Sequence, residues 1–247
     1  MRRRVIVSGG GTGIGRAIAR RFALAGDEVT ILGRRAAVLA GAAADLNTEI
    51  GQELVRFVSA DLSRPLDVER VVEAIGGEPP IDVIVNNAGG VGTEAGDGLQ
   101  GVEEDWLAEF SRNVLTAVLL TNALEPRLRR PGGSIVNVSS IAAVAGGGDS
   151  YSGAKAAILG WTIDLAVRLG PEGIRANAVV PGYVQETEFF GDRMTPERHE
   201  RLITRTLLGR AGRPDDVAAT VFFLASDDAG YVTGQFLHAN GGATLGR

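Results

Sequence analysis

Short runs of β-branched and apolar residues alternate along this chain with longer stretches in which apolar residues recur at helical spacing. The short runs predict strands at Val5–Val7, Val29–Leu32, Leu54–Val58, Ile81–Val85, Ser134–Val138, Ile174–Val180 and Gln235–Ala239. The longer stretches predict helices at Gly13–Ala25, Ala36–Ile50, Leu66–Ile75, Val102–Leu128, Tyr151–Leu169, 195–208 and 214–225. This alternation predicts an α/β fold, a Rossmann-type doubly wound parallel sheet of about seven strands with helices on both faces. Because no linker interrupts the pattern, we expect a single domain over residues 1–247.

Two of the predicted helical stretches, Val114–Leu124 and Ala156–Leu169, are apolar on nearly every side. A helix without a polar face must be covered all round. Either both stretches lie deep in the core, or one face meets a second subunit. The length of the stretches favours the second interpretation, so we expect a homo-oligomer, a dimer or a homotetramer.

Composition narrows the range of partners. The chain carries a formal net charge of −5 and its basic residues form no long block, which argues against nucleic-acid binding. It has no cysteine and two histidines, so neither a disulfide framework nor a zinc site is expected. No apolar run approaches the roughly 18 residues that a membrane span needs. We therefore expect a cytoplasmic protein that binds no metal, membrane or nucleic acid.

The first predicted strand leads directly into a glycine-rich turn that runs from Ser8 through Gly9, Gly11, Thr12, Gly13 and Ile14 to Gly15. Three of these glycines form a G-x-x-x-G-x-G pattern just before the first predicted helix. Glycines let backbone N–H groups and the positive end of a helix approach a pyrophosphate closely. A flexible loop is the alternative, but the position between a strand and a helix favours a dinucleotide site.

The end of the second predicted strand indicates which dinucleotide is bound. Enzymes that use NAD carry an acidic residue there, which bonds to the ribose 2′-OH. This chain has Gly33, Arg34 and Arg35 instead, so a 2′-phosphate is not repelled and Arg34 can pair with it. This favours NADP (NADPH) over NAD, which stays possible, since both arginines could be solvated residues at a helix start. Asp61, before Leu62, either accepts a hydrogen bond from the adenine amino group or caps a turn.

Tyr151 and Lys155 stand four residues apart in a predicted helix, on one face and one turn apart. A neighbouring ammonium group favours the tyrosinate, so we expect Lys155 to lower the pKa of Tyr151 from about 10 toward the working range. Ser139 and Ser140 end an apolar run just before this helix, where a hydroxyl can hold a carbonyl oxygen while the phenol delivers a proton. The set suits the reduction of a ketone or the oxidation of an alcohol, although the bare spacing also occurs as a surface helical pair.

Together these residues resemble the short-chain dehydrogenase/reductase family over essentially the whole chain. The matching pieces come in the family's order: Ser8–Gly15, Asp61, Asn86–Gly89, Asn113, Ser140, Tyr151 with Lys155, Pro181–Gly182, Val232–Gln235 and Asn240–Gly242. Each motif alone is modest, whereas the whole set is specific. The chain most resembles the branch that includes 3-oxoacyl-(acyl carrier protein) reductases and many ketone and sugar-alcohol dehydrogenases.

The resemblance implies a role for each residue. Tyr151 would be the proton donor in reduction, Lys155 would lower its pKa and hold the nicotinamide ribose, and Ser140 rather than Ser139 would polarise the substrate carbonyl. Asn113 would hold a water that links Lys155 to solvent; without the resemblance it is simply a polar residue on a helix. The implied cofactor-binding residues are Ser8, Gly9, Gly11, Thr12, Gly13, Ile14, Gly15, Arg34, Arg35, Asp61, Leu62, Asn87, Ala88, Gly89, Tyr151, Lys155, Pro181, Gly182, Val184 and Thr187.

Two segments bear on the substrate. The segment near 185–208 is expected to be a mobile lid, whose Phe189, Phe190 and Met194 either cover an apolar ligand or pack the lid onto the body. Arg127, Arg129 and Arg130 form a small basic cluster, which either docks an acidic acyl carrier protein or is a solvated helix end.

We therefore expect an NADP-dependent reductase of a 3-oxoacyl thioester or small ketone. The alternatives are an NAD-dependent alcohol or sugar dehydrogenase, favoured by Thr12 where NADP users often carry a basic residue, and a non-catalytic nucleotide-binding scaffold.

Overall fold

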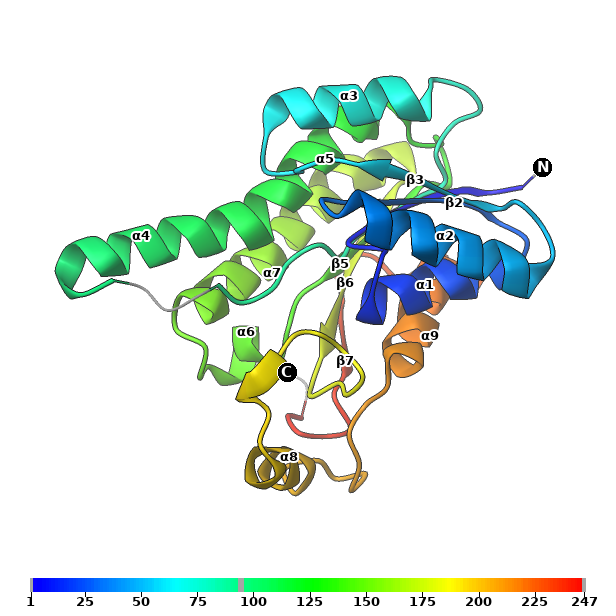
Figure 1. Ribbon diagram of the computed structural model, residues 1–247. Helices are drawn as coiled ribbons and strands as arrows, with labels where there is room; N and C mark the ends of the chain where they lie inside the picture. Colours follow the sequence, from blue (N-terminus) through cyan, green and yellow to red (C-terminus); the bar gives the residue numbers. More distant parts are fainter. Residues whose placement is uncertain (1, 93–95, 246–247) are drawn as a thin grey trace.

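A computed structural model describes residues 2–92 and 96–245, so positions 1, 93–95 and 246–247 of the expected domain lie outside the described residues (Figure 1). Within the described part, one seven-stranded sheet has the order β3-β2-β1-β4-β5-β6-β7, and every neighbouring pair is parallel. The strands are β1 (Arg4–Ser8), β2 (Glu28–Gly33), β3 (Val55–Ser59), β4 (Val83–Asn86), β5 (Ser134–Val138), β6 (Arg175–Pro181) and β7 (Phe236–Ala239). This topology confirms the expected α/β class.

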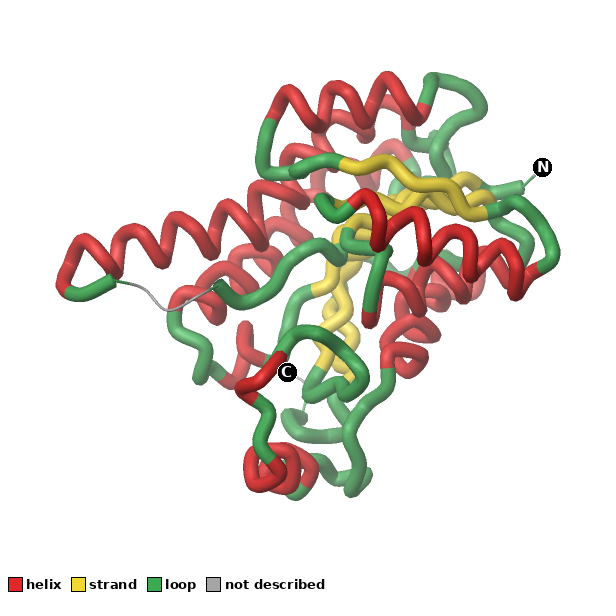
Figure 2. Tube along the Cα trace, viewed as in Figure 1, coloured by secondary structure: helices red, strands yellow, loops and turns green. Residues whose placement is uncertain are grey.

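Helices cover both faces of the sheet, as the apolar strands require (Figure 2). One layer consists of α1 (Gly13–Leu24), α2 (Ala36–Ile50) and α9 (Pro214–Leu224). The other consists of α3 (Pro65–Ile75), α4 (Gly98–Phe110), α5 (Thr116–Leu124) and α7 (Ser150–Leu169). Alternate residues of β1 show why both layers are needed: Val5 and Val7 pack into the first core, and Ile6 packs into the second.

The order of the strands reverses between β1 and β4, and the loops that follow these two strands diverge there. Ser8 at the end of β1 joins them, since its hydroxyl accepts hydrogen bonds from the N–H groups of Asn87 and Ala88 at 3.0 and 2.9 Å. The Asn87 amide donates back to the Ser8 carbonyl at 3.0 Å. Open α/β sheets bind ligands at this kind of topological switch point, outside the carboxyl ends of the strands.

The predicted helix over 195–208 is wrong beyond residue 203, where α8 (Pro196–Ile203) ends. The Thr206 hydroxyl donates to the Ile203 carbonyl and accepts from the Arg210 N–H, and these bonds hold a turn in place of a further helical turn. The predicted strand Ile81–Val85 starts too early, because Ile81 makes only an isolated bridge to Leu128 before β4 begins at Val83. Other helix ends agree within a few residues, and the short α6 (Ala142–Ala145) was not expected.

The two stretches that are apolar all round do not lie wholly in the core. Each buries one face against the sheet and exposes large apolar side chains on the other: Leu115 is 45% exposed, Ile163 47% and Val167 72%. The interpretation that both helices are covered within one chain is therefore wrong for these faces. Among the described residues, no helix combines the length and apolar character needed to cross a bilayer.

Candidate active site

A cavity of about 1130 Å3 opens at the carboxyl ends of the strands, over the switch point. Every residue predicted for catalysis or cofactor binding lines it, except Ser8 and Asn113. These two are 1% exposed and lie directly behind the lining, Ser8 under the turn after β4 and Asn113 against Gly90. Residues from the start, middle and end of the sequence thus meet at one site.

The glycine turn brings the backbone of β1 unusually close to the first turn of α1. A Cβ atom on Gly15 would lie 2.0 Å from the carbonyl oxygen of Gly9 and 2.6 Å from the amide nitrogen of Asn87, so only glycine fits there. The first N–H groups of α1 have no partner within the helix and face the cavity, as a pyrophosphate would require. These residues fit the phosphates of a dinucleotide.

The adenosine end of the cavity contains Arg34, Arg35 and Asp61. The Arg35 guanidinium forms an ion pair with Glu188 at 2.7 Å, and Thr12 donates to the same carboxylate at 3.4 Å. Glu188 therefore bridges the 185–208 segment to the glycine turn, whereas the Arg34 guanidinium has no ion-pair partner among the residues that the structure describes. Asp61 accepts hydrogen bonds from both the N–H and the hydroxyl of Ser63, which is the turn-capping arrangement, and these bonds lower its pKa.

Tyr151, Lys155 and Ser140 meet at the other end of the cavity. Tyr151 and Lys155 lie on one face of α7, with the ammonium nitrogen 5.8 Å from the centre of the phenol ring. Ser140 hydrogen-bonds to the Tyr151 phenol and accepts from the Ala142 N–H at 3.2 Å. The Ser139 hydroxyl instead donates to the Lys155 carbonyl at 2.8 Å. Ser140 is therefore the serine that faces the tyrosine.

The expected lowering of the Tyr151 pKa is wrong for the protein alone. Burial raises the pKa of Tyr151 to about 12, and the hydrogen bond with Ser140 opposes this only in part. Burial also lowers the pKa of Lys155 to about 8, while the charge of Glu109 raises it. Desolvation is thus the largest cause of both pKa shifts. The phenol is protonated at neutral pH, which suits a proton donor.

Asn113 lies in a π-helical turn, η1 (Ser111–Leu115), within the helical run that was predicted as one helix over Val102–Leu128. Its amide donates to the Glu109 carbonyl at 3.1 Å, the acceptor that the backbone of an α-helix would use. The side chain thus competes with the main chain for that carbonyl, which accounts for the wider turn. The amide oxygen accepts from the Gly90 N–H at 3.0 Å, so Asn113 ties η1 to the loop after β4.

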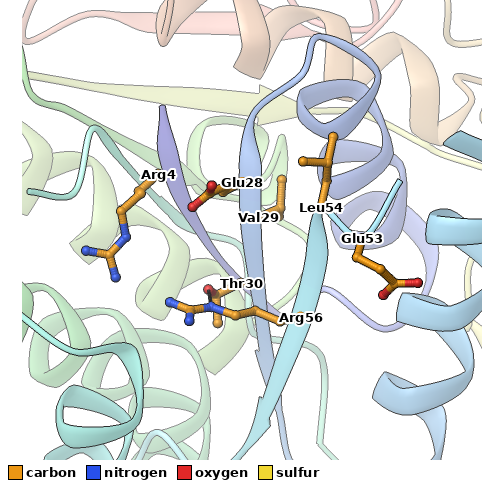
Figure 3. A pocket seen from close by; sticks show the side chains of 7 residues that line it. All are labelled: Arg4, Glu28, Val29, Thr30, Glu53, Leu54 and Arg56. Atoms are coloured by element: carbon orange, nitrogen blue, oxygen red, sulfur yellow. Dashed lines mark hydrogen bonds between the residues drawn. The ribbon is translucent and has the colours of Figure 1, made fainter. Parts of the chain in front are cut away.

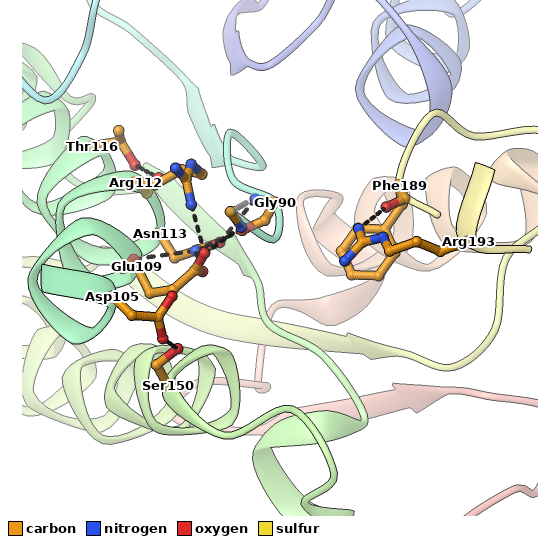
Figure 4. A network of polar contacts seen from close by, with 10 residues as sticks. Gly90, Asp105, Glu109, Arg112, Asn113, Thr116, Ser150, Phe189 and Arg193 are labelled. Atoms are coloured by element: carbon orange, nitrogen blue, oxygen red, sulfur yellow. Dashed lines mark hydrogen bonds and ion pairs between the residues drawn. The ribbon is translucent and has the colours of Figure 1, made fainter. Parts of the chain in front are cut away.

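Glu109 is a site residue that the sequence did not reveal (Figure 4). Its carboxylate is 1% exposed and accepts a hydrogen bond from the Asn113 amide at 2.7 Å. It also accepts from the Gly92 N–H and forms an ion pair with Arg112. In the sequence it is one acidic residue in an acidic helix, and only its position one turn before Asn113 distinguishes it.

The 185–208 segment covers the substrate end through aromatic contacts. The Phe189 ring lies 5.6 Å from the Tyr151 ring, and the Phe190 ring lies 5.5 Å from that of Tyr183. Thr187 sits over the glycine turn, 3.3 Å from a Cβ placed on Gly13. The aromatic residues therefore both line the cavity and attach the segment to the body, so the two interpretations of this segment coexist.

The basic cluster proposed as a carrier-docking site is at the wrong edge of the sheet. Arg129 forms an ion pair with Asp82 before β4, Arg130 pairs with Glu125 and Glu172, and Arg127 donates to carbonyls of α3. Leu128 bridges to Ile81 beside the amino ends of the strands, whereas the cavity is at their carboxyl ends. The charges are satisfied internally and lie away from the site.

A second cavity of about 100 Å3 lies among the amino ends of β1, β2 and β3 (Figure 3). Arg4 and Arg56 line it and donate to the Ile75 carbonyl at the end of α3. Burial lowers the pKa of Arg4. These guanidiniums neutralise the negative end of a helix, and the cavity is too small for a dinucleotide.

Known proteins resemble this chain over nearly its full length. The model of a family described as Enoyl-(Acyl carrier protein) reductase matches residues 9–244. The 3-oxoacyl-[acyl-carrier-protein] reductase FabG of Chlamydia trachomatis is 35% identical over 245 residues, 96% of this chain and 95% of that protein. An acetoacetyl-CoA reductase of Shinella zoogloeoides is 38% identical over 250 residues, 98% of each chain. A crystal structure described as a short-chain dehydrogenase/reductase, glucose/ribitol dehydrogenase, from Brucella melitensis has a TM-score of 0.88 at 30% identity, covering 99% of this chain and 97% of that one.

Proposed function

This chain belongs to the short-chain dehydrogenase/reductase family and is an oxidoreductase of ketones and alcohols, and from that premise we propose that it reduces a ketone with NADPH, with Tyr151 as the proton donor. The observation that carries the proposal is the meeting of Tyr151, Ser140 and Lys155 in one cavity with the glycine turn. A scaffold that only binds nucleotides has no need of this set.

When bound in this cavity, a nicotinamide would supply the hydride for the carbonyl carbon. Ser140 holds the carbonyl oxygen, and Tyr151 donates the proton that this oxygen needs as it gains charge. Lys155 is 4% exposed and donates to the Val138 carbonyl at 3.1 Å, so its ammonium is fixed beneath the site. Asn113 and Glu109 hold the loop after β4 by hydrogen bonds. The Glu109 carboxylate also places a negative charge near Lys155.

The substrate that we propose is a 3-oxoacyl thioester or a small ketone. The activities of relatives support it, because a 3-oxoacyl-[acyl-carrier-protein] reductase and an acetoacetyl-CoA reductase each match this chain over almost its whole length. A glucose and ribitol dehydrogenase homolog of rice, 35% identical over 257 residues, supports the alternative of an NAD-dependent alcohol or sugar dehydrogenase.

One assay tests the proposal. Ketones, 3-oxoacyl thioesters and sugars are screened while the loss of NADPH and NADH absorbance is followed in parallel. We expect turnover of a 3-oxo substrate with NADPH preferred. Binding of cofactor without turnover of any substrate would instead favour a scaffold.

We expect the Arg34→Ala variant to lose NADPH preference. Arg34 lines the cavity and Arg35 is engaged by Glu188, so Arg34 is the principal partner for the 2′-phosphate. Loss of one charge-assisted hydrogen bond corresponds to a roughly 10- to 150-fold fall in kcat/KM with NADPH. Activity with NADH should change little. Arg70→Ala, on exposed α3, is the control, and an equal fall with both cofactors would contradict the assignment.

We expect the Glu109→Gln variant to lose activity at a lower pH than the wild type. The Glu109 charge raises the pKa of Lys155 and of Tyr151, so its removal lowers both. The ammonium and the phenol then each lose a proton at lower pH. Both losses shift the alkaline limb of the pH profile of kcat/KM for reduction to lower pH. Glu103→Gln, on the exposed side of the same helix, should leave the profile in place. An unmoved limb in Glu109→Gln would show that this carboxylate is electrostatically silent.

We propose that the exposed apolar side chains of η1 and α7, which are Leu115, Ile163 and Val167, join two copies of the chain. Sedimentation or light scattering should then report a dimer or tetramer, and Val167→Glu should shift it toward smaller species by burying a charge in the interface. Leu66→Glu on α3 is the matched control, since Leu66 and Val167 are both 72% exposed. A monomeric wild type would refute the proposal.

A further inference from the structure

The substrate end of the cavity is lined by arginines that belong to neither the cofactor site nor the proton-donating group. Arg193, Arg198, Arg201 and Arg205 all line it, from the end of the segment after β6 and from α8. The chain as a whole is acidic, with a formal net charge of −5. This local excess of positive charge therefore runs against the charge of the protein.

Two of these arginines, Arg198 and Arg201, lie three residues apart in α8, a spacing that places them side by side on the helix. Leu202 lines the cavity beside them. Arg205 lies two residues past the end of the helix. The acidic residues of α8, Glu197 and Glu200, are exposed and do not line the cavity. The lining of the cavity thus includes the arginines of α8 and leaves out its carboxylates.

The cations are not neutralised by the side chains that the structure describes. Arg193 donates to the carbonyls of Phe189 and Phe190, and Arg198 donates to the Arg193 carbonyl while its guanidinium lies 5.0 Å from the centre of the Phe190 ring. Within the described side chains, neither Arg201 nor Arg205 has a hydrogen-bond or ion-pair partner for its guanidinium. Like charges gathered without partners repel one another and oppose folding. A ligand of opposite charge would reduce this repulsion.

Carboxylates do line the cavity, but at its other end. Glu188 is held by Arg35 and Thr12, and Asp61 is held by Ser63. At the substrate end Arg112 is a further cation, and its partner Glu109 is buried behind the lining. Among the described residues that line the substrate end of the cavity, the charged side chains are therefore all cationic, whereas the carboxylates of the lining are held at the adenosine end.

We propose that Arg198 and Arg201 of α8, together with Arg205 just beyond its end, form an anion subsite, which binds a negatively charged group of the substrate remote from the reacting carbonyl. The chemistry is that of an organic phosphate or carboxylate, which guanidinium groups bind by charge-assisted hydrogen bonds. The subsite is separate from Arg34 and rests on the proposed ketone reduction. It replaces the Arg127, Arg129 and Arg130 cluster as the basic surface that meets substrate.

The test compares substrates that share a reacting group and differ in charge. Acetoacetyl-CoA carries phosphates that the neutral acetoacetyl thioester of N-acetylcysteamine lacks, together with the pantothenate and adenosine parts of CoA, and acetoacetate and its ethyl ester differ by a carboxylate. In the full-length protein, Arg201→Ala/Arg205→Ala should reduce kcat/KM for the preferred anionic substrate by about tenfold or more and leave its neutral counterpart nearly unchanged. The pair that responds identifies the source of the anion. Added salt should slow the wild type on the anionic member only.

The outcomes separate the subsite from the proposed function. An equal loss on charged and neutral substrates overturns the subsite, because it would reflect a displaced lid, and leaves ketone reduction standing. No turnover of any of the four substrates by the wild type with either cofactor overturns both. The control variant Arg16→Ala/Arg70→Ala removes the same amount of charge outside the cavity. It should leave the ratio of kcat/KM between the charged and the neutral substrate of each pair unchanged. If the double variant fails to bind NADPH, Arg205→Ala alone, beyond the end of α8, decides by the same comparison.

Discussion

Replacing Tyr151 with phenylalanine is expected to lower kcat for ketone reduction by about 10²- to 10⁴-fold while NADPH binding is retained. The phenol is 7% exposed, hydrogen-bonded to Ser140 and, with its pKa raised to about 12, fully protonated at neutral pH. Phenylalanine keeps the ring and its contact with Phe189, and it removes only the proton that the carbonyl oxygen requires. Single-turnover reduction with NADPH, together with a binding titration, measures the two effects separately.

Tyr183→Phe is the matched control for this prediction. Tyr183 lines the same cavity, but its hydroxyl interacts with His199 at a distance of 2.7 Å instead of with Ser140. This variant should keep most of its turnover. A Tyr151→Phe enzyme that retained wild-type kcat would refute the proton-donor assignment, and with it the proposed mechanism.

Replacing Gly15 with alanine is expected to abolish measurable dinucleotide binding and to destabilise the protein by about 1–3 kcal/mol. The added methyl group would meet the Gly9 carbonyl oxygen at 2.0 Å, and the atoms in its way belong largely to the backbone of the glycine turn. Relief of the clash must separate the turn from α1, and the N–H groups that would hold the pyrophosphate move with it. Calorimetric titration with NADPH and thermal unfolding report the two consequences.

Gly41→Ala provides the comparison, because a Cβ atom at this position in α2 meets nothing within 4 Å. Alanine there should leave binding unchanged and stabilise the helix slightly. Wild-type affinity in the Gly15→Ala variant would mean that the turn is more compliant than its close contacts suggest. The pyrophosphate-binding site would then have to lie elsewhere in the cavity.

The fold follows from local patterns in the sequence. Apolar β-branched runs of a few residues can be buried only as central strands, and the helical periodicity between them supplies the layers that cover both faces. The glycine turn was recognisable for the same reason, since its neighbours in space are also its neighbours in the chain. Tyr151 and Lys155 belong to this class too, because one turn of a helix fixes their relation.

Only the tertiary structure could decide which charges are satisfied and which protons are held. The raised pKa of Tyr151 has burial in the folded chain as its largest cause, and spacing along the helix does not reveal that burial. Glu109 gains its position through the loop after β4, and Arg35 is bound by Glu188, which lies 153 residues away in the chain. Arg129 and Arg201 look alike in the sequence, yet one pairs with Asp82 and the other lines the cavity. Short-range order is encoded by spacing along the chain, whereas solvation and electrostatics depend on every group that the fold brings near.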